Sequence, residues 1–279
     1  MGFNKAKELT MNEREIFYHN GVRDLIEDKN VSILVCGGGT SDKHIFEKLG
    51  FQDVTISNLD TRMTENEYAP FRWKHENAES LSFNAESFDY VVTNAAIHHA
   101  SSPHKVLTEM YRVARKGILA FESRDSVIMR FLERYGATQT YEHAAVYYND
   151  CKYGGMNNTE IPNYIYRWTN REIEKTIQSY APYCKHKFVY RYGTAFPCTP
   201  ELEVKGQLKK NLIKFMRPVF IVFVTVFPKQ KNLFAFYVEK PIIPNSLFPW
   251  LIFDAKEGKI RFNKEWGDRK YKRPTKRCT

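Results

Sequence analysis

Short runs of apolar, β-branched residues recur along the first half of the chain and alternate with longer segments whose apolar residues are spaced three and four apart. Runs of this kind are typical of strands that are buried on both faces of a parallel sheet. They lie at 31–36, 54–57, 88–93 and 118–122. The alternation with helical segments predicts an α/β fold, a doubly wound and mostly parallel sheet that helices cover on both faces.

The helical segments are recognised by their periodicity and by their end signals. The first is predicted over 3–28. A second is capped by the segment 40–42 and stopped by Gly50, and a third begins at Ser102 and Pro103 and is expected to end at Gly117. Further along, Thr169 and Asn170 can cap a helix over 171–180. The stretch 204–227 is ambiguous, because its apolar residues fit a helical stripe while 220–227 is strand-like in composition; we favour a helix there. Strands are expected over 187–191 and 232–239.

Between 123 and 170 the regular alternation stops, and tyrosine becomes frequent. A long insertion in a compact α/β domain is usually a lid or a binding element. We therefore expect a substrate-binding cap at about 123–170 within one domain, residues 1–244. Three prolines between 241 and 249 mark the exit into a basic C-terminal extension, residues 245–279.

The composition is that of a folded globular protein, with 279 residues of which 43% are hydrophobic and 27% charged. The formal net charge is +10, but residues 256–279 hold ten Lys and Arg against three acidic residues and so carry +7 of it. The positive charge therefore describes the extension rather than the whole molecule. A short basic tail is weak support for nucleic-acid binding.

Two further features concern the compartment. The longest apolar run, 218–227, is about half of the roughly 20 residues that a membrane-spanning helix needs, and the first residues do not resemble a secretory signal. We therefore expect a cytoplasmic protein. The five cysteines are widely spread and contain no C-x-x-C pair, which predicts reduced thiols rather than disulfides or a zinc site.

A glycine triplet, Gly37 to Gly39, follows the first predicted strand, and a carboxylate, Asp60, lies about 20 residues further on. Asn58 is the alternative position for this second feature. A glycine turn that opens a helix lets backbone amides approach a ligand, and a carboxylate after the next strand can bind ribose hydroxyls. The βαβ unit therefore predicts a site for a nucleoside cofactor.

With these motifs, the sequence resembles the class I S-adenosylmethionine-dependent methyltransferases, of the small-molecule type that includes enzymes of quinone and polysaccharide biosynthesis. The likeness covers about residues 31–122 by motif. It implies S-adenosylmethionine as cofactor and S-adenosylhomocysteine as product. The glycine loop would approach the methionine half, the acidic residue would bind the ribose, and the segment 76–81 would bind the adenine. The cofactor-binding residues that the resemblance implies are Gly37, Gly38, Gly39, Thr40, Asn58, Asp60, Asn77, Ala78 and Asn94.

The sequence departs from the family pattern at three positions. The acidic residue usual in the first strand is Val35, the last glycine of the loop is Ser41, and the acid of the adenine segment is Asn77. The amide oxygen of Asn77 can still accept a hydrogen bond from the adenine amine. The loss of the first acid weakens the expected grip on the cofactor ammonium and leaves a non-catalytic cofactor-binding scaffold as an alternative.

Methyl transfer from a sulfonium is an in-line displacement, in which alignment and the exclusion of water supply much of the catalysis, so no metal is required. A hydroxyl acceptor must also lose a proton, and histidine is suited to take it near neutral pH. The candidate catalytic residues are His98 and His99 after the fourth-strand motif and Tyr141 and His143 in the insertion. The candidate substrate-binding residues are Tyr164, Tyr166 and Arg167.

Two other enzyme classes fit less well. A nicotinamide-dependent oxidoreductase would need a third glycine where Asp42 stands. A nucleic-acid amine methyltransferase would carry a proline-containing tetrad where this chain reads Asn94-Ala95-Ala96-Ile97, and extrusion of a base would favour a broad basic face over a basic tail.

We therefore expect a methyltransferase that acts on a small polar acceptor, at an oxygen of a sugar or an activated sugar derivative in polysaccharide biosynthesis. The alternative acceptor is lipid-like or a quinone, because the amphipathic segment 204–227 would allow peripheral contact with a membrane surface.

Overall fold

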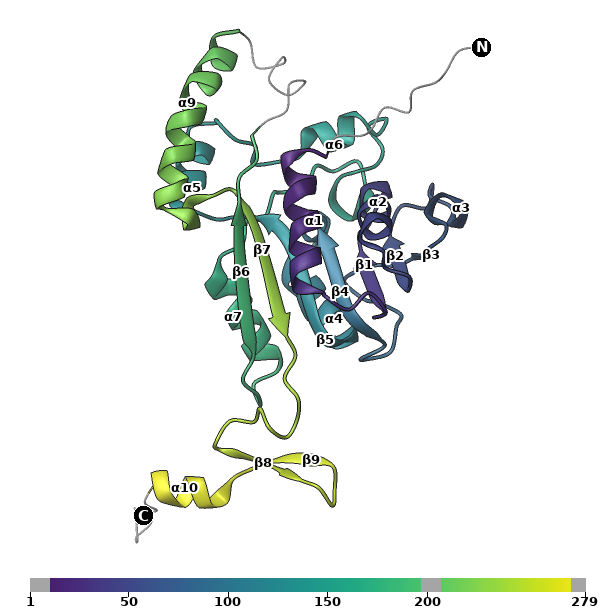
Figure 1. Cartoon of the computed structure of the whole chain (residues 1–279), viewed down its shortest axis with the longest axis vertical. Helices are drawn as coiled ribbons and strands as arrows, with labels where there is room; N and C mark the ends of the chain where they lie inside the picture. The colour runs from purple at the N-terminus through teal and green to yellow at the C-terminus, as the bar shows by residue number, and fades with distance from the viewer. Residues whose placement is uncertain (1–10, 197–206, 272–279) are drawn as a thin grey trace.

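The computed structural model describes residues 11–196 and 207–271, in which helices cover both faces of a central sheet (Figure 1). Its strands are β1 (Ile33–Cys36), β2 (Val54–Asn58), β3 (Arg72–His75), β4 (Phe88–Asn94), β5 (Ala114–Ser123), β6 (Lys187–Gly193) and β7 (Leu233–Glu239). They pair in the order β3-β2-β1-β4-β5-β7-β6. β1 to β5 are parallel, and β7 runs antiparallel to both of its neighbours. The predicted fold class is confirmed.

The alternation of side chains along β1 divides the core between the two faces. Ile33 and Val35 pack with α1 (Glu13–Leu25), α2 (Thr40–Leu49) and α3 (Glu65–Tyr68) on one face. Leu34 and Cys36 pack with α4 (Pro103–Val113) and α7 (Asn170–Tyr180) on the other. Every residue of β1 is therefore buried, which explains why its sequence is continuously apolar.

Most predicted helix ends are confirmed. Gly50 adopts the left-handed conformation at the end of α2, and Ser102 and Pro103 begin α4. Thr169 caps α7 in a reciprocal capping box with Glu172. The first helix is shorter than predicted, because it begins after its cap Asn12 and ends at Leu25; residues 3–10 of the prediction lie outside the described residues.

The predicted role of Gly117 is wrong. The helix ends at Val113, and β5 begins at the next residue, so that Gly117 lies inside a strand. A Cβ atom at this position would lie 2.7 Å from the carbonyl oxygen of Val238 on β7. The glycine is thus required by the close approach of a neighbouring strand, a long-range contact that local sequence does not reveal.

The insertion contains short helices rather than an irregular loop. These are α5 (Val127–Arg134), α6 (His143–Tyr147) and the 3-10 turn η2 (Met156–Asn158). Isolated β-bridges join Arg124 to Trp168 and Tyr141 to Tyr164, and so fasten the insertion near its two ends. Figure 1 places α6 beyond the carboxyl ends of the parallel strands, close to the edge where the glycine loop lies.

The apolar segment after β6 forms α9 (Gln207–Val226), which contains Pro218 and is followed by the turn η3 (Pro228–Gln230). Residues 204–206 of the predicted helix lie outside the described residues. Among the described helices, α9 included, none combines the length and apolar character needed to cross a membrane.

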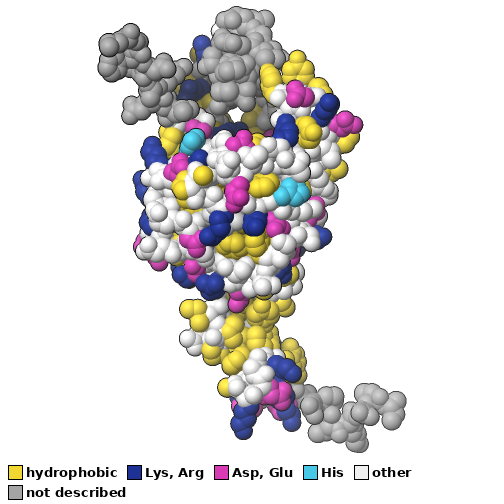
Figure 2. All heavy atoms as spheres, turned by 90° about the vertical axis from the view of Figure 1, so that its right-hand side faces the viewer, with side chains coloured by type: hydrophobic (Ala, Val, Ile, Leu, Met, Phe, Trp, Pro, Cys, Tyr) yellow, Lys and Arg dark blue, Asp and Glu magenta, His cyan; other side chains and the backbone are white. Residues whose placement is uncertain are grey.

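The C-terminal extension is not only a basic tail. It forms a hairpin of β8 (Leu251–Asp254) and β9 (Lys259–Phe262), followed by α10 (Lys264–Lys270); residues 272–279 lie outside the described part. Trp266 packs against Trp250, Phe262 and Tyr271 and so holds the unit together. Figure 2 shows hydrophobic side chains on the narrow segment that joins this unit to the body and basic side chains at its far end.

The glycine loop yields a stability prediction. A Cβ atom on Gly38 would lie 2.8 Å from both Ile56 Cγ2 and Val35 Cγ1, whereas one on Gly39 would meet nothing within 4 Å. Gly38→Ala should therefore lower the free energy of unfolding by about 1–3 kcal/mol, the usual cost of overpacking. Gly39→Ala should change it by less than about 1 kcal/mol. Urea titration followed by circular dichroism measures both, and equal effects would show that the loop does not press on the sheet.

Candidate active site

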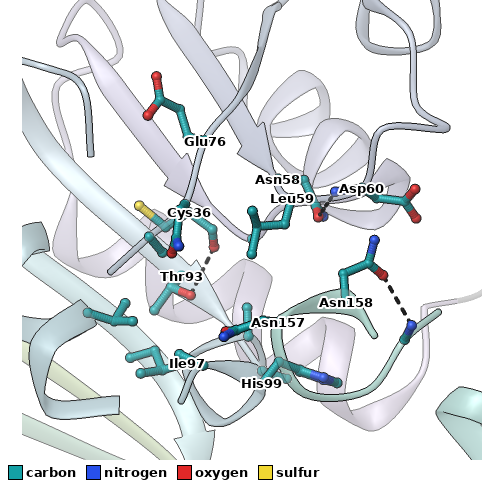
Figure 3. A pocket seen from close by; sticks show the side chains of 18 of the residues that line it. Cys36, Asn58, Leu59, Asp60, Glu76, Thr93, Ile97, His99, Asn157 and Asn158 are labelled. Atoms are coloured by element: carbon teal, nitrogen blue, oxygen red, sulfur yellow. Dashed lines mark hydrogen bonds between the residues drawn. The ribbon is translucent and has the colours of Figure 1, made fainter. Parts of the chain in front are cut away.

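A cavity of about 280 Å³ lies at the carboxyl edge of the parallel strands. Its walls come from the ends of β1, β2 and β4, from the segments after β2 and β3, from the turn η1 (Ile97–His99), and from the cap loop 149–158. Figure 3 shows the side chains of these segments around the cavity. In open α/β sheets, ligands bind outside the carboxyl ends of the strands, so this cavity is the candidate active site.

The glycine loop contributes its first residue to the cavity. Gly37 has a φ of 65°, and a Cβ there would lie 2.4 Å from Ala96 Cβ, so both conformation and space require glycine. Gly38, Gly39 and Thr40 are not among the lining residues; they form the turn into α2.

A buried carboxylate holds this turn in place. Asp42 Oδ2 accepts a hydrogen bond from the Gly39 N–H, and Asp42 Oδ1 accepts one from the Tyr18 hydroxyl of α1, both at 2.8 Å. Burial raises the pKa of the Asp42 carboxyl. Asp42 stands where a dinucleotide-binding motif would have its third glycine, and it fixes the glycine loop to α1.

Both candidate ribose ligands line the cavity, and both already have partners. Asn58 is the last residue of β2; its amide nitrogen donates to the Gly38 carbonyl at 2.9 Å, and its amide oxygen accepts the Asp60 N–H at 3.0 Å. The Asp60 carboxylate receives Arg62 Nε and one terminal nitrogen, the shorter contact being 2.6 Å. These hydrogen bonds lower the pKa of Asp60, so its carboxylate is charged at the cavity wall (Figure 3).

The adenine segment also reaches the cavity, through Glu76, Asn77 and Ala78. The Asn77 side-chain oxygen accepts the Glu79 N–H at 2.9 Å, which shapes the turn. Asn94, in contrast, does not line the cavity; it pairs with Phe121 inside the sheet. Its neighbour Ala95, with a φ of 50°, turns the chain there and lines the wall instead.

The two histidines have different surroundings. His98 is buried, and its Nδ1 lies 2.7 Å from Glu122 Oε2 on β5. Its Nε2 lies 3.5 Å from Glu142 Oε2, and His99 Nε2 lies 3.1 Å from the same oxygen. Burial alone would lower the pKa of His98, but the charges of Glu122 and Glu142 outweigh it and raise this pKa. The pKa of the Glu142 carboxyl is lowered. Burial would raise this pKa, but the hydrogen bonds and charges of His98 and His99 outweigh burial.

Of the four candidate catalytic residues, His99 lines the cavity and His98 lies directly behind it. Tyr141 and His143 do not line it. The exposed ring of Tyr141 packs against Tyr164, with the ring centres 5.6 Å apart, and against His143 at 6.2 Å. The structure therefore brings the histidine pair to the cavity and leaves the other two candidates on the outside of the cap.

The candidate substrate-binding residues lie elsewhere. Tyr164, Tyr166 and Arg167 line a second, polar hollow, whose lining shares no residue with the first. Arg167 pairs with Glu133 at 3.2 Å, and the Tyr166 hydroxyl donates to Glu172 at 2.7 Å. The Arg167 Nη2 donates to the Gln139 carbonyl at 2.5 Å, whereas Nε and Nη1 of Arg167 are buried without a hydrogen-bond partner among the described residues.

Sequence reasoning missed the polar residues that the cap supplies to the cavity, Asn149, Asn157 and Asn158. Asn157 and Asn158 have φ values of 50° and 58°, and the glycine- and asparagine-rich composition of this loop was the available signal. The Asn157 side-chain nitrogen donates to Ser101 Oγ at 2.6 Å. Its oxygen is buried and has no hydrogen-bond partner among the described residues.

Part of the chain matches a known protein family. Residues 34–121 match the family model described as a methyltransferase domain, and no curated protein sequence matches the chain. The YcgJ protein from Bacillus subtilis superposes with a TM-score of 0.50 at 14% identity, over 80% of this chain and 99% of that chain.

Two other solved structures are similar at lower scores. A SAM-dependent methyltransferase from Thermotoga maritima has a TM-score of 0.45 at 15% identity, over 82% of this chain and 90% of that chain. Magnesium protoporphyrin IX methyltransferase from Synechocystis has 0.48 at 10% identity, over 81% and 82%. The family match covers the glycine loop, Asn58 and Asp60, the segment 76–81 and β4. Residues 34–121 are accordingly similar to a methyltransferase domain, and they lie within a doubly wound α/β sheet of the class I methyltransferase type.

Proposed function

We propose that this enzyme transfers the methyl group of S-adenosylmethionine to an oxygen of a small polar acceptor, a sugar or an activated sugar derivative. One observation carries the proposal: a single cavity joins the glycine turn and the ribose and adenine segments to His99 and to the amides of the cap. Cofactor groups and a polar acceptor would therefore meet in one place, which is what an in-line displacement requires.

The cofactor lies along the strand ends in this proposal. The Gly37 turn approaches the methionine half, Asp60 and Asn58 bind the ribose, and Asn77 and Ala78 face the adenine. A carboxylate has about four lone-pair positions, so Asp60 can accept from ribose hydroxyls while Arg62 stays bound. Val35 is buried in β1 and offers no charge to the cofactor ammonium.

In the proposed reaction, the acceptor oxygen attacks the methyl carbon of the sulfonium. The C–S bond breaks, and its electron pair remains on sulfur to give S-adenosylhomocysteine, while an O–C bond forms. The hydroxyl proton passes to His99, whose Nε2 is 3.1 Å from the Glu142 carboxylate, so the carboxylate stabilises the imidazolium that results. His98 is buried between the Glu122 and Glu142 carboxylates, and its ring packs against that of His99, so it positions His99 rather than accepting the proton.

The polar nature of the acceptor is supported by Asn157. Its side-chain oxygen is buried without a partner among the described residues, and a buried oxygen that receives no hydrogen bond costs free energy. A hydroxyl of the methyl acceptor would donate this hydrogen bond. Asn149 and Asn158 add two further amides to the same wall, and amides and hydroxyls are well matched in hydrogen bonding.

A second candidate, a lipid-like or quinone acceptor, is favoured by α9. Its Phe215, Val222 and Val226 side chains are 73%, 67% and 66% exposed. Figure 1 shows α9 beyond the same end of the sheet as the cap helix α6, and the turn η3 that follows α9 contacts α5. Exposed apolar surface of this extent is typical of an interaction site. Together with Lys214 and Lys229, which are also exposed, it has the character of a helix that lies on an anionic membrane.

Cofactor binding gives the first prediction here. Asp60→Ala should weaken S-adenosylhomocysteine about 5- to 150-fold in titration calorimetry, because ribose hydroxyls lose their acceptor. Asp53→Ala is the matched control: this exposed carboxylate also pairs with an arginine, Arg72, but it lies at the opposite end of β2. An unchanged affinity in Asp60→Ala would move the ribose contact to Asn58.

The acceptor class can be tested with methyl-deuterated S-adenosylmethionine. The enzyme is incubated with separate pools of nucleoside diphosphate sugars, oligosaccharides, quinols and phospholipids, and mass spectrometry then reads the label. We expect deuterium in a sugar pool. Label in the quinol or phospholipid pool would support the second candidate, and no label in any pool would contradict methyl transfer to all four classes.

The labelled pool then serves as the assay for His99. Removal of a general base typically costs about 10²- to 10⁴-fold in rate, so His99→Ala should lower kcat by at least about 10²-fold. Its affinity for S-adenosylhomocysteine should stay within about twofold. A full turnover rate in His99→Ala would assign the proton to another group.

The membrane hypothesis is tested by flotation with vesicles of phosphatidylcholine and phosphatidylglycerol. If α9 docks on lipid, the chain floats with the vesicles, and the double variant Phe215→Glu, Val222→Glu stays at the bottom because two buried charges oppose insertion. The control is Ile242→Glu, Ile252→Glu, which places the same charges on exposed apolar residues of the C-terminal part. Wild-type protein that does not float removes the support for a lipid-like acceptor.

A further inference from the structure

Three potential metal ligands converge where the cap meets the sheet. His98 and His99 come from η1, and Glu142 is the residue that precedes α6. The two imidazole Nε2 atoms lie 3.5 Å and 3.1 Å from Glu142 Oε2, and each of the three residues offers a ligand atom within 4.8 Å of the others. The histidines and Glu142 are 43 or more positions apart in the sequence, and the fold brings them to one point.

The spacing is that of ligands around one ion. Zinc bonds to imidazole nitrogen and carboxylate oxygen are about 2.0–2.2 Å long, so two ligands at a tetrahedral angle lie about 3.3–3.5 Å apart and two at a right angle about 3 Å apart. The two separations to Glu142 fall in this range. Two histidines and one glutamate are also a ligand set that catalytic zinc sites use, with a further position open to substrate.

The surroundings of His98 point to an additional ligand. Its side chain is 4% exposed, and its Nε2 has no hydrogen-bond partner among the described residues, because 3.5 Å to Glu142 is long for a hydrogen bond. This unpartnered nitrogen faces the cluster. Its Nδ1–H donates to Glu122 at 2.7 Å, and a carboxylate behind a histidine is the usual outer partner of a metal-bound imidazole.

Hydrogen bonds also fix the turn that carries the histidines and the side chain of Glu142. Glu122 accepts the backbone N–H groups of Ala96 and Ile97 at 3.1 Å and 3.0 Å, which fixes the turn that carries both histidines. The side-chain nitrogen of Asn163 lies 3.3 Å from Glu142 Oε2 and from the His98 carbonyl oxygen. The cap and the turn are thus joined by a network that orients the three side chains before any ion arrives.

We propose that His98, His99 and Glu142 form a binding site for a divalent transition metal ion, with Zn²⁺ as the best match to the ligand set. The ion binds to Nε2 of each histidine, displacing a proton where one is present, and to the Glu142 carboxylate. Because His99 lines the main cavity, the open coordination position faces the space where an acceptor would lie.

Metal binding stands on these side chains alone, whereas its role in catalysis rests on the proposed function. A bound ion would coordinate the acceptor oxygen and stabilise the negative charge that develops there. The hydroxyl proton then leaves to water, and the ion takes over from His99 the task of making the oxygen nucleophilic.

The test is titration of the metal-stripped full chain with Zn²⁺ in a calorimeter, in a Cys151→Ser background because Cys151 is an exposed thiol. We expect one ion per chain with a micromolar or tighter Kd. His99→Ala and Glu142→Gln should each weaken it at least tenfold. The control is the pair His44→Ala and Glu47→Gln, an exposed histidine and glutamate 3.6 Å apart on α2, and these variants should bind as the parent does. With Co²⁺, the visible absorption bands of a low-coordinate site should appear in the parent and vanish in Glu142→Gln.

Absence of binding, or binding that survives in both ligand variants, overturns the inference. Circular dichroism and S-adenosylhomocysteine affinity show whether the variants are folded, and Glu142→Gln keeps the shape of the side chain for this purpose. The Zn²⁺ titration itself uses neither cofactor nor acceptor. A chain that binds Zn²⁺ but methylates nothing would refute the proposed function and support the metal site. A chain that methylates a sugar but does not bind Zn²⁺ would support the proposed function and refute the metal site.

Discussion

The candidate site depends on one buried carboxylate, that of Glu122. Its side chain is fully buried, and it accepts hydrogen bonds from the backbone N–H groups of Ala96 and Ile97 and from His98 Nδ1. A buried charge is tolerated when hydrogen bonds satisfy it, and here three donors from one turn do so. The turn after β4 is thereby tied to β5, and the direction of both histidines follows from that attachment.

The cap supplies the remaining polar groups of the candidate site. Glu142 brings a second carboxylate to the histidines from the opposite side, and Asn157 brings an amide whose oxygen is buried without a partner among the described residues. The bridge between Tyr141 and Tyr164 and the contacts of Asn163 hold the cap against the sheet. The site therefore lies between two parts of the chain. The proposed cofactor segments belong to the sheet, and the polar groups come from both the sheet and the cap.

Buried strands lie below the site, and a helix with exposed apolar side chains, α9, lies at the same end of the molecule. The strands below the site are buried on both faces, which fixes the positions of the glycine turn and of Asn58. On the same end of the molecule, α9 presents large apolar side chains to solvent (Figure 1). Exposed apolar surface of this kind usually marks a place where something binds, and it is the feature that favours a lipid-like acceptor as the second candidate.

The sequence by itself determined the features whose causes are local. Continuous apolar runs identified the strands of a parallel sheet, Gly50 and Thr169 marked helix ends through their own backbone and side-chain chemistry, and the glycine triplet marked the turn in which Gly37 has a positive φ. Tertiary structure alone decided the features that depend on distant neighbours. Gly117 lies in a strand because β7 approaches it, Tyr164 and Arg167 turn to a hollow away from the main cavity, and Glu142 reaches the histidines because the cap folds back over the sheet. Such contacts join residues tens of positions apart, and no periodicity or end signal in the chain encodes which of them will meet.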